Sequence, residues 1–121
     1  MTVQEIAADF AALCSAGKFD EAGEKYWSAD IVSVEPMAPP GGDPVTRGID
    51  AVRAKGVWWY ENHEIHSAEA HGPYVNGDQF IIRFKMDVTM KANGVRMQME
   101  EDALYTVSDG KIVEERFFFG S

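Results

Sequence analysis

Apolar and polar residues alternate along the second half of the chain, and three turn dipeptides divide this half into four segments. The turns are Asn76-Gly77, Asn93-Gly94 and Asp109-Gly110, whose residue types tolerate the positive φ angles of a tight hairpin. Consecutive strands joined by tight turns run antiparallel, so the pattern predicts an antiparallel meander whose long middle strands twist and curve. The four predicted strands are residues 64–75, 78–91, 95–107 and 111–119.

The first half of the chain shows helical spacing instead. Thr2 and Glu5 form a capping box before a first helix, which we expect to end at Gly17. A shorter helix with Asp20 as its predicted N-cap follows. Residues 31–35 then predict a short strand rich in β-branched side chains.

A Pro- and Gly-rich segment at residues 36–44 separates this strand from a third helix, predicted at residues 49–62. A loop of this length is either a functional rim or a simple connection, and both alternatives remain open. The order of elements predicts one domain over residues 1–121. Its expected class is α+β, with three N-terminal helices packed in a strongly curved mixed or antiparallel β-sheet, an α+β cone.

The charge balance excludes several classes of partner. The 121 residues include 20 acidic and 11 basic side chains, for a net charge of −9. We therefore expect neither nucleic acid nor an anionic membrane surface as a partner, because both require clustered basic residues. The single cysteine suits a reducing compartment, and the N-terminus lacks the features of a signal peptide, so the expected location is cytoplasmic. No phosphate-binding loop or nucleophile elbow occurs, and we expect no cofactor.

The third predicted strand carries a carboxylate within its apolar row. By strict alternation Glu101 shares this row with Met99 and Tyr105 and points inward. Burial disfavours the charged form of a carboxylate and raises its pKa, which suits general acid–base catalysis near neutral pH. A β-bulge would instead turn Glu101 outward and Asp102 inward, so both acids are candidate catalytic residues.

Two further side chains are candidate partners in proton transfer. Glu35 ends the short strand directly before Pro36, and its direction stays open because both rows of that strand are partly apolar. His66 is a candidate proton carrier, with a surface histidine as the alternative. A metal site is not expected, because strand alternation sends His66 and His71 to opposite faces.

Large apolar side chains are numerous for a chain of this size, and they predict the wall of a core or of a pocket for a small apolar molecule. The last strand ends in three consecutive phenylalanines, so both of its faces carry apolar side chains. We expect a second copy of the chain to cover the outer face, which gives a homodimer through the outer side of the meander. The predicted pocket-lining residues are Trp27, Met37, Trp59, Met86, Met99, Phe117 and Phe119.

Three segments resemble a known group of proteins: Tyr26-Trp-Ser-Ala-Asp30, Thr46-Arg-Gly-Ile-Asp-Ala-Val52 and Leu104-Tyr-Thr-Val-Ser-Asp-Gly-Lys-Ile-Val113. Over essentially its full length the chain resembles the SnoaL-like families of the nuclear-transport-factor-two-like superfamily. That superfamily also holds ketosteroid isomerase, scytalone dehydratase and limonene epoxide hydrolase. The resemblance implies an α+β cone with an apolar pocket, a dimer, and pocket carboxylates in the catalytic members.

The resemblance also implies roles for individual residues. Ketosteroid isomerase uses a carboxylate base together with a Tyr and a protonated acid. With a one-residue shift the base corresponds to Glu35, the protonated acid falls within Glu101–Ala103, and the Tyr falls near Phe10, which has no hydroxyl. The Asp-Arg-Asp set of limonene epoxide hydrolase cannot be placed on this sequence. Arg83 is present, but it lies on the outward face of its predicted strand. We therefore expect a cofactor-independent isomerase, cyclase or dehydratase, with a non-catalytic binding or dimerisation module as the alternative.

Overall fold

The structure, a computed structural model, describes residues 1–38 and 41–119 and places three helices and six strands within them. The predicted loop at residues 36–44 includes Pro39 and Pro40, which lie outside the described residues. In chain order the elements are α1 (Val3–Ser15), α2 (Phe19–Tyr26), β1 (Trp27–Val34), β2 (Val45–Arg47), α3 (Ile49–Asn62), β3 (His63–Asn76), β4 (Gln79–Met90), β5 (Arg96–Ser108) and β6 (Lys111–Phe119).

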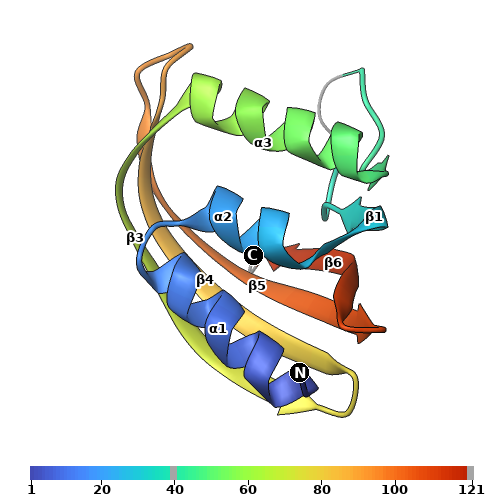
Figure 1. Ribbon diagram of the computed structural model, residues 1–121. Helices are drawn as coiled ribbons and strands as arrows, with labels where there is room; N and C mark the ends of the chain where they lie inside the picture. Colours follow the sequence, from blue (N-terminus) through green and yellow to red (C-terminus); the bar gives the residue numbers. More distant parts are fainter. Residues whose placement is uncertain (39–40, 120–121) are drawn as a thin grey trace.

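All six strands form one sheet in the order β2-β1-β6-β5-β4-β3. Neighbouring strands are antiparallel except β1 and β6, which pair in parallel, so the sheet is mixed. Figure 1 shows that the long strands curve strongly and that the three helices lie on the concave side of the sheet. The predicted α+β class is confirmed, and the sheet is open, with β2 and β3 as its edges.

The helices follow the predicted signals with one exception. α1 has the expected capping box, in which Thr2 and Glu5 satisfy each other's backbone N–H groups, and it ends just before Gly17 at φ +76°. The N-cap of α2 is Lys18 rather than Asp20, without a side-chain capping bond, so that prediction is wrong. None of the helices in the described part of the chain is long and apolar enough to cross a membrane.

The strand predictions succeed in the second half of the chain and fall short in the first. β3 to β6 agree with the predicted ranges to within one residue at each end. β1 begins at Trp27 rather than at residue 31, because α2 ends at Tyr26 and the chain passes directly into the sheet. The short strand β2 pairs antiparallel with β1 and has no counterpart among the predicted elements.

The three predicted turns differ in their backbone geometry. Asp109 and Gly110 both have positive φ, at 51° and 76°, as a two-residue hairpin of the predicted kind requires. At the other two turns only the glycine does, with φ of 61° at Gly77 and 70° at Gly94. The dipeptides therefore locate all three turns, although only one of them has both residues in the left-handed region.

Helices and sheet share one core whose centre is an aromatic group. The Phe10 ring of α1 lies 4.7 Å from the Tyr105 ring of β5 and 5.9 Å from the Phe80 ring of β4, centroid to centroid. Phe80 and Tyr105 stack at 4.9 Å. All three are buried, so this group fixes α1 against the middle of the concave face.

Two helical glycines give a matched test of how the fold places Trp27. A Cβ atom at Gly23 would lie 2.5 Å from the Trp27 ring, whereas one at Gly56 would meet nothing within 4 Å. We expect Gly23→Ala to lower the free energy of unfolding by about 1–3 kcal/mol through overpacking. Gly56→Ala should raise it by about 0.5–1 kcal/mol, because alanine has the better helix propensity. Urea denaturation measures both, and effects of the same sign would contradict the close contact.

Candidate functional site

The concave face of the sheet places Glu101 among aromatic side chains. In the strand registers Glu101 lies directly opposite Phe84 of β4 on one side and Phe119 of β6 on the other. Partners opposite each other in a sheet share a face, and Phe84 is part of the buried core. Glu101 therefore points inward, which agrees with strict alternation along its strand.

The surroundings of Glu101 favour its protonated form. The carboxyl group accepts no hydrogen bond from the described residues. Burial raises its pKa from the ordinary 4.5 to about 7, with the nearby negative charges of Glu35 and Glu115 acting in the same direction and Lys55 opposing them. At neutral pH both protonation states are populated, which is the property that a general acid or base requires.

A second inward carboxyl group, that of Glu115, is fully enclosed and fully bonded. Trp27 donates its indole N–H to one carboxyl oxygen at 2.9 Å, and the Ser33 hydroxyl donates to the other at 2.8 Å. Burial raises the pKa of Glu115, while Lys55 and the two hydrogen bonds act in the opposite direction. Because both carboxyl oxygens are occupied, Glu115 orients Trp27 and Ser33 rather than facing open space.

Lys55 connects this group to Glu35. The Lys55 ammonium group donates to the Ser33 hydroxyl and, at 2.9 Å, to a carboxyl oxygen of Glu35. It also lies 5.4 Å from the centre of the Phe117 ring. Ile31 and Ser33 have no exposed surface, so their row on β1 faces inward and Glu35, two residues further along, follows it. The open question of the direction of Glu35 is thereby answered: it faces α3.

Together these residues form a polar cluster at one end of the concave face. Strands β1, β5 and β6 supply three of its members, α3 supplies the fourth, and the fifth is the residue that follows the end of β1. We use the term acid cluster for Glu35, Lys55, Ser33, Glu115 and Glu101. Within it, Glu101 alone has no hydrogen bond to another described residue.

Three of the predicted site residues are directed away from the acid cluster. Asp102 faces the convex side, where the Arg83 guanidinium binds it at 2.8 Å and lowers its pKa. The alternative of a β-bulge that turns Asp102 inward is wrong, because β4 and β5 pair without a shift. His66 is the extra residue of a β-bulge in β3, which exposes its ring and places it 2.6 Å from the Thr89 hydroxyl. Met37 is 72% exposed, since β1 ends at Val34 and its alternation does not extend that far.

The other predicted lining residues are on or near the inward rows. Met86 lies opposite Met99, and Phe117 lies opposite Ala103. Trp59 of α3 stacks on the His63 ring at 3.7 Å. Trp27 holds Glu115 as described above, and Phe119 adjoins Glu101 with 40% of its surface exposed. Whether these side chains contact a ligand stays a prediction.

Sequence reasoning missed Ser33, Lys55 and Glu115. Glu115 precedes Phe117 and Phe119 in the same alternating row, so the inward direction proposed for those two residues already implied it. Lys55 was overlooked because the inward side of α3 was predicted from its apolar side chains alone. A lysine at the edge of that side can still reach the interior, since its aliphatic stem is long. Ser33 lies between two valines and carries no signal of its own.

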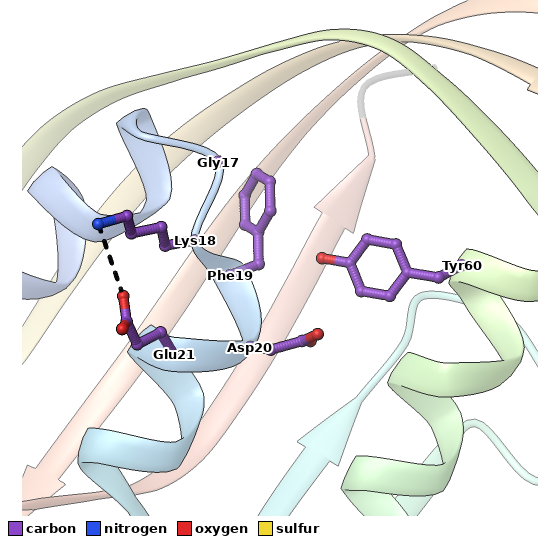
Figure 2. A pocket seen from close by; sticks show the side chains of 6 residues that line it. All are labelled: Gly17, Lys18, Phe19, Asp20, Glu21 and Tyr60. Carbon is purple, nitrogen blue, oxygen red and sulfur yellow. Dashed lines mark ion pairs between the residues drawn. The ribbon is translucent and has the colours of Figure 1, made fainter.

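A hollow of about 380 Å³ opens between the start of α2 and α3 (Figure 2). Gly17, Lys18, Phe19, Asp20 and Glu21 line one side, and Tyr60 lines the other. Figure 2 shows the Tyr60 hydroxyl directed toward Phe19 and Asp20. Burial raises the pKa of Tyr60 to about 12, so its hydroxyl stays protonated at neutral pH. The Phe19 ring also lies 6.0 Å from that of Phe84, the neighbour of Glu101.

Comparison with known proteins places the fold in one family. A family model described as the SnoaL-like domain matches residues 1–119. A crystal structure of a candidate SnoaL-like polyketide cyclase from Mesorhizobium loti is 53% identical, with a TM-score of 0.94, over 98% of this chain and 100% of that one. No curated protein matches the chain.

Two more distant structures share the fold. A candidate isomerase from Bacillus subtilis is 21% identical, with a TM-score of 0.79, over 99% of this chain and 90% of that one. A protein from Catenulispora acidiphila with a ketosteroid isomerase-like fold, solved in complex with trimethylamine, is 17% identical with a TM-score of 0.72, over 98% of this chain and 88% of that one.

Proposed function

The chain belongs to the SnoaL-like domain family, and on that basis we propose that it is a cofactor-independent isomerase, cyclase or dehydratase acting on a small apolar molecule. The observation that carries the proposal is Glu101, an inward carboxyl group between two phenyl rings with a pKa of about 7 and no internal hydrogen bond. A group of this kind exchanges protons with a bound molecule near neutral pH.

The proposed step is a proton transfer at a carbon next to a carbonyl group. The Glu101 carboxylate takes the proton, and the electrons of the broken C–H bond form a C=C bond while the carbonyl oxygen becomes an enolate oxygen. The protonated Glu101 then returns the proton to the same carbon or to another one. Beside it, the positive charge of Lys55 and the negative charge of Glu35 cancel in an ion pair. Glu101 is therefore the group whose charge changes when the proton is transferred.

Exchange of α-protons for deuterium tests the proposal without knowledge of the substrate. A panel of cyclic ketones and 1,3-diketones in D₂O would be followed by proton NMR with and without protein. Since the base form of Glu101 takes the proton, we expect the catalysed rate to rise with pH and to level off above a midpoint of about 7. Exchange no faster than in buffer across the panel, or a rate independent of pH between 5 and 8, would contradict this function.

A non-catalytic binding module is the second candidate. It is favoured by the fact that most of the acid cluster is satisfied internally, with Glu35 bound to Lys55 and Glu115 bound to Ser33 and Trp27. A module of this kind would bind members of the panel without accelerating their exchange, so the same experiment separates the two functions.

The homodimer and the cytoplasmic location also stay proposals. On the convex face Phe118 is 48% exposed and Ile81 is 38% exposed, and a second copy of the chain is the partner that we propose for this face. The apolar residues adjoin ion pairs such as Arg83 with Asp102, so the face is less apolar than the three phenylalanines of the last strand suggest.

A further inference from the structure

Three carboxyl groups face one end of the concave side of the sheet, and their negative charges repel one another. Glu35 follows the end of β1, Glu101 lies on β5 and Glu115 lies on β6. Carboxylates held close together favour protonation of one of the group. Glu115 is enclosed, and both of its oxygens accept hydrogen bonds. Glu35 and Glu101 are partly exposed, so these two can pass a proton to a bound molecule.

Lys55 distinguishes between these two carboxyl groups. Its ammonium group donates to a carboxyl oxygen of Glu35 at 2.9 Å and also to the Ser33 hydroxyl. The Lys55 and Glu35 side chains are only 28% and 29% exposed, so water and salt screen this pair less than a surface pair. An ammonium group at this distance binds a carboxylate more strongly than it binds a neutral carboxyl group.

Glu101 has no such donor, although the same ammonium group lies near it. Lys55 is 5.4 Å from the centre of the Phe117 ring. In the register of β5 and β6, Glu101 lies opposite Phe119, and Phe117 is its diagonal neighbour on the same face. The positive charge of Lys55 therefore acts on Glu101 across the Phe117 ring and not through a hydrogen bond.

The titratable groups around Glu101 come from several elements. Glu35 and Glu115 favour its protonation, and Lys55 opposes it. Burial raises the pKa of Cys14 in α1 to about 12, and burial also raises the pKa of Tyr105 on β5, so both groups are uncharged at neutral pH. Among the groups that act on Glu101 in the part of the chain that the structure describes, Lys55 is therefore the one positive charge.

We propose that Lys55 is a positioning residue that decides which accessible carboxyl group carries the exchangeable proton. By binding Glu35 it keeps that group ionised, and it leaves the proton to Glu101, which has no donor. Because Lys55 belongs to α3 whereas the carboxyl groups belong to the sheet, the packing of α3 determines how readily Glu101 takes up the proton. The inference rests on the proposed function only for the transfer of that proton to a ligand.

Lys55→Met tests the proposal, because methionine keeps an apolar stem and removes the charge. The protonation midpoint of Glu101, measured without any ligand by ¹³C NMR of labelled glutamate carboxyl groups, should rise by about 0.5–1.5 pH units. Lys55→Arg keeps the charge and should restore most of the wild-type midpoint. Lys85→Met is the matched control: Lys85 follows Phe84 on β4, but it faces the convex side near Glu100, and its loss should leave the midpoint unchanged.

Glu35→Gln should shift the same midpoint in the opposite direction. It removes a negative charge that favours protonation of Glu101 and leaves Lys55 without its ionic partner, so the midpoint should fall by about 0.5–1 pH unit. This variant also decides the question if Lys55→Met does not fold. The proposal is overturned if the Glu101 midpoint stays at the wild-type value in the folded variants, or if Lys85→Met moves it as far as Lys55→Met does.

The pH profile of α-proton exchange separates this role from a merely structural one. In Lys55→Met the midpoint of the profile should move upward together with the NMR midpoint. A lower rate at every pH with an unchanged midpoint would show that Lys55 only supports the fold, and it would contradict the proposal. If the NMR midpoints shift as expected while no protein variant accelerates exchange, the role of Lys55 stands and the proposed enzymatic function fails.

Discussion

Glu101→Gln should lower the catalysed rate of α-proton exchange by about 10²–10⁴-fold and should stabilise the protein at pH 8. The first effect follows because glutamine has nearly the shape of glutamate but cannot take a proton near neutral pH. The second follows because the wild-type protein holds a carboxylate between Phe84 and Phe119 without a hydrogen bond. Loss of function combined with gain of stability is expected of a functional group in an unfavourable environment.

The pH dependence of this stabilisation has a definite sign. Below pH 4.5 Glu101 is protonated in both the folded and the unfolded chain, and it contributes no pH-dependent difference. Between pH 4.5 and about 7 the unfolded chain ionises first, so the wild-type protein loses stability as the pH rises. Above about 7 both states are ionised and the loss is complete. Glu101→Gln should therefore exceed the wild type by about 2–3 kcal/mol at pH 8 and by almost nothing at pH 4.

Glu100→Gln is the matched control for both effects. Glu100 is the preceding residue on β5, but it points to the convex face and lies 3.7 Å from Lys85, with more than half of its side chain exposed. Its replacement should change stability by less than about 1 kcal/mol and should leave exchange unaffected. Urea denaturation at several pH values and the exchange assay give the two readouts. If Glu101→Gln were less stable than the wild type at pH 8, the carboxyl group would have internal partners.

Glu115→Ala should have the opposite effect and lower the free energy of unfolding by about 3–5 kcal/mol. The replacement leaves the indole N–H of Trp27 without its acceptor and removes the acceptor of the Ser33 hydroxyl, both within the interior. It also leaves a cavity where the side chain was 94% buried, as its exposure of 6% shows. For a chain of this length the loss corresponds to a melting temperature lower by about 10–20 °C.

Two further variants separate the causes of this destabilisation. Glu114→Ala removes the preceding acid, which pairs with Arg116 across an exposed surface, and should cost less than about 1 kcal/mol. Glu115→Gln keeps the volume and one acceptor oxygen, so it should fall between the wild type and the alanine variant. Thermal unfolding followed by circular dichroism measures all three. A melting temperature of Glu115→Ala within a few degrees of the wild type would show that the cluster does not hold β1 against β6.

The sequence predicts the second half of the fold well because local signals and tertiary pairing agree there. Turn residues such as Asp109 and Gly110 define where strands end, and alternation between them defines the inward row. The start of β1 was harder to locate because Trp27 fits a helical face as well as a strand. The three-residue strand β2 exists only through its pairing with β1, which no local pattern encodes.

The residues of the candidate site differ in the same way: local patterns predict the direction of some of them, and tertiary packing determines the others. The inward direction of Glu101 follows from alternation alone, since β4 and β5 pair without a bulge. His66 could not be placed in this way, because a bulge after Ile65 breaks the alternation of β3. Lys55 enters the site from a helix, and its contact with Glu35 depends on how α3 packs against β1. The sequence determines which row faces inward, whereas tertiary packing determines which charges meet.

The pKa of Glu101 is the quantity on which the account depends most directly. We would label the glutamate side chains with ¹³C and follow the chemical shifts of their carboxyl carbons by NMR between pH 3 and 9. The resonance that is missing from the spectrum of Glu101→Gln is assigned to Glu101. We predict a midpoint of about 7 for this resonance. A midpoint near the ordinary 4.5 would show a solvated or internally bonded carboxylate, and it would contradict the role of Glu101 as the proton-transfer group.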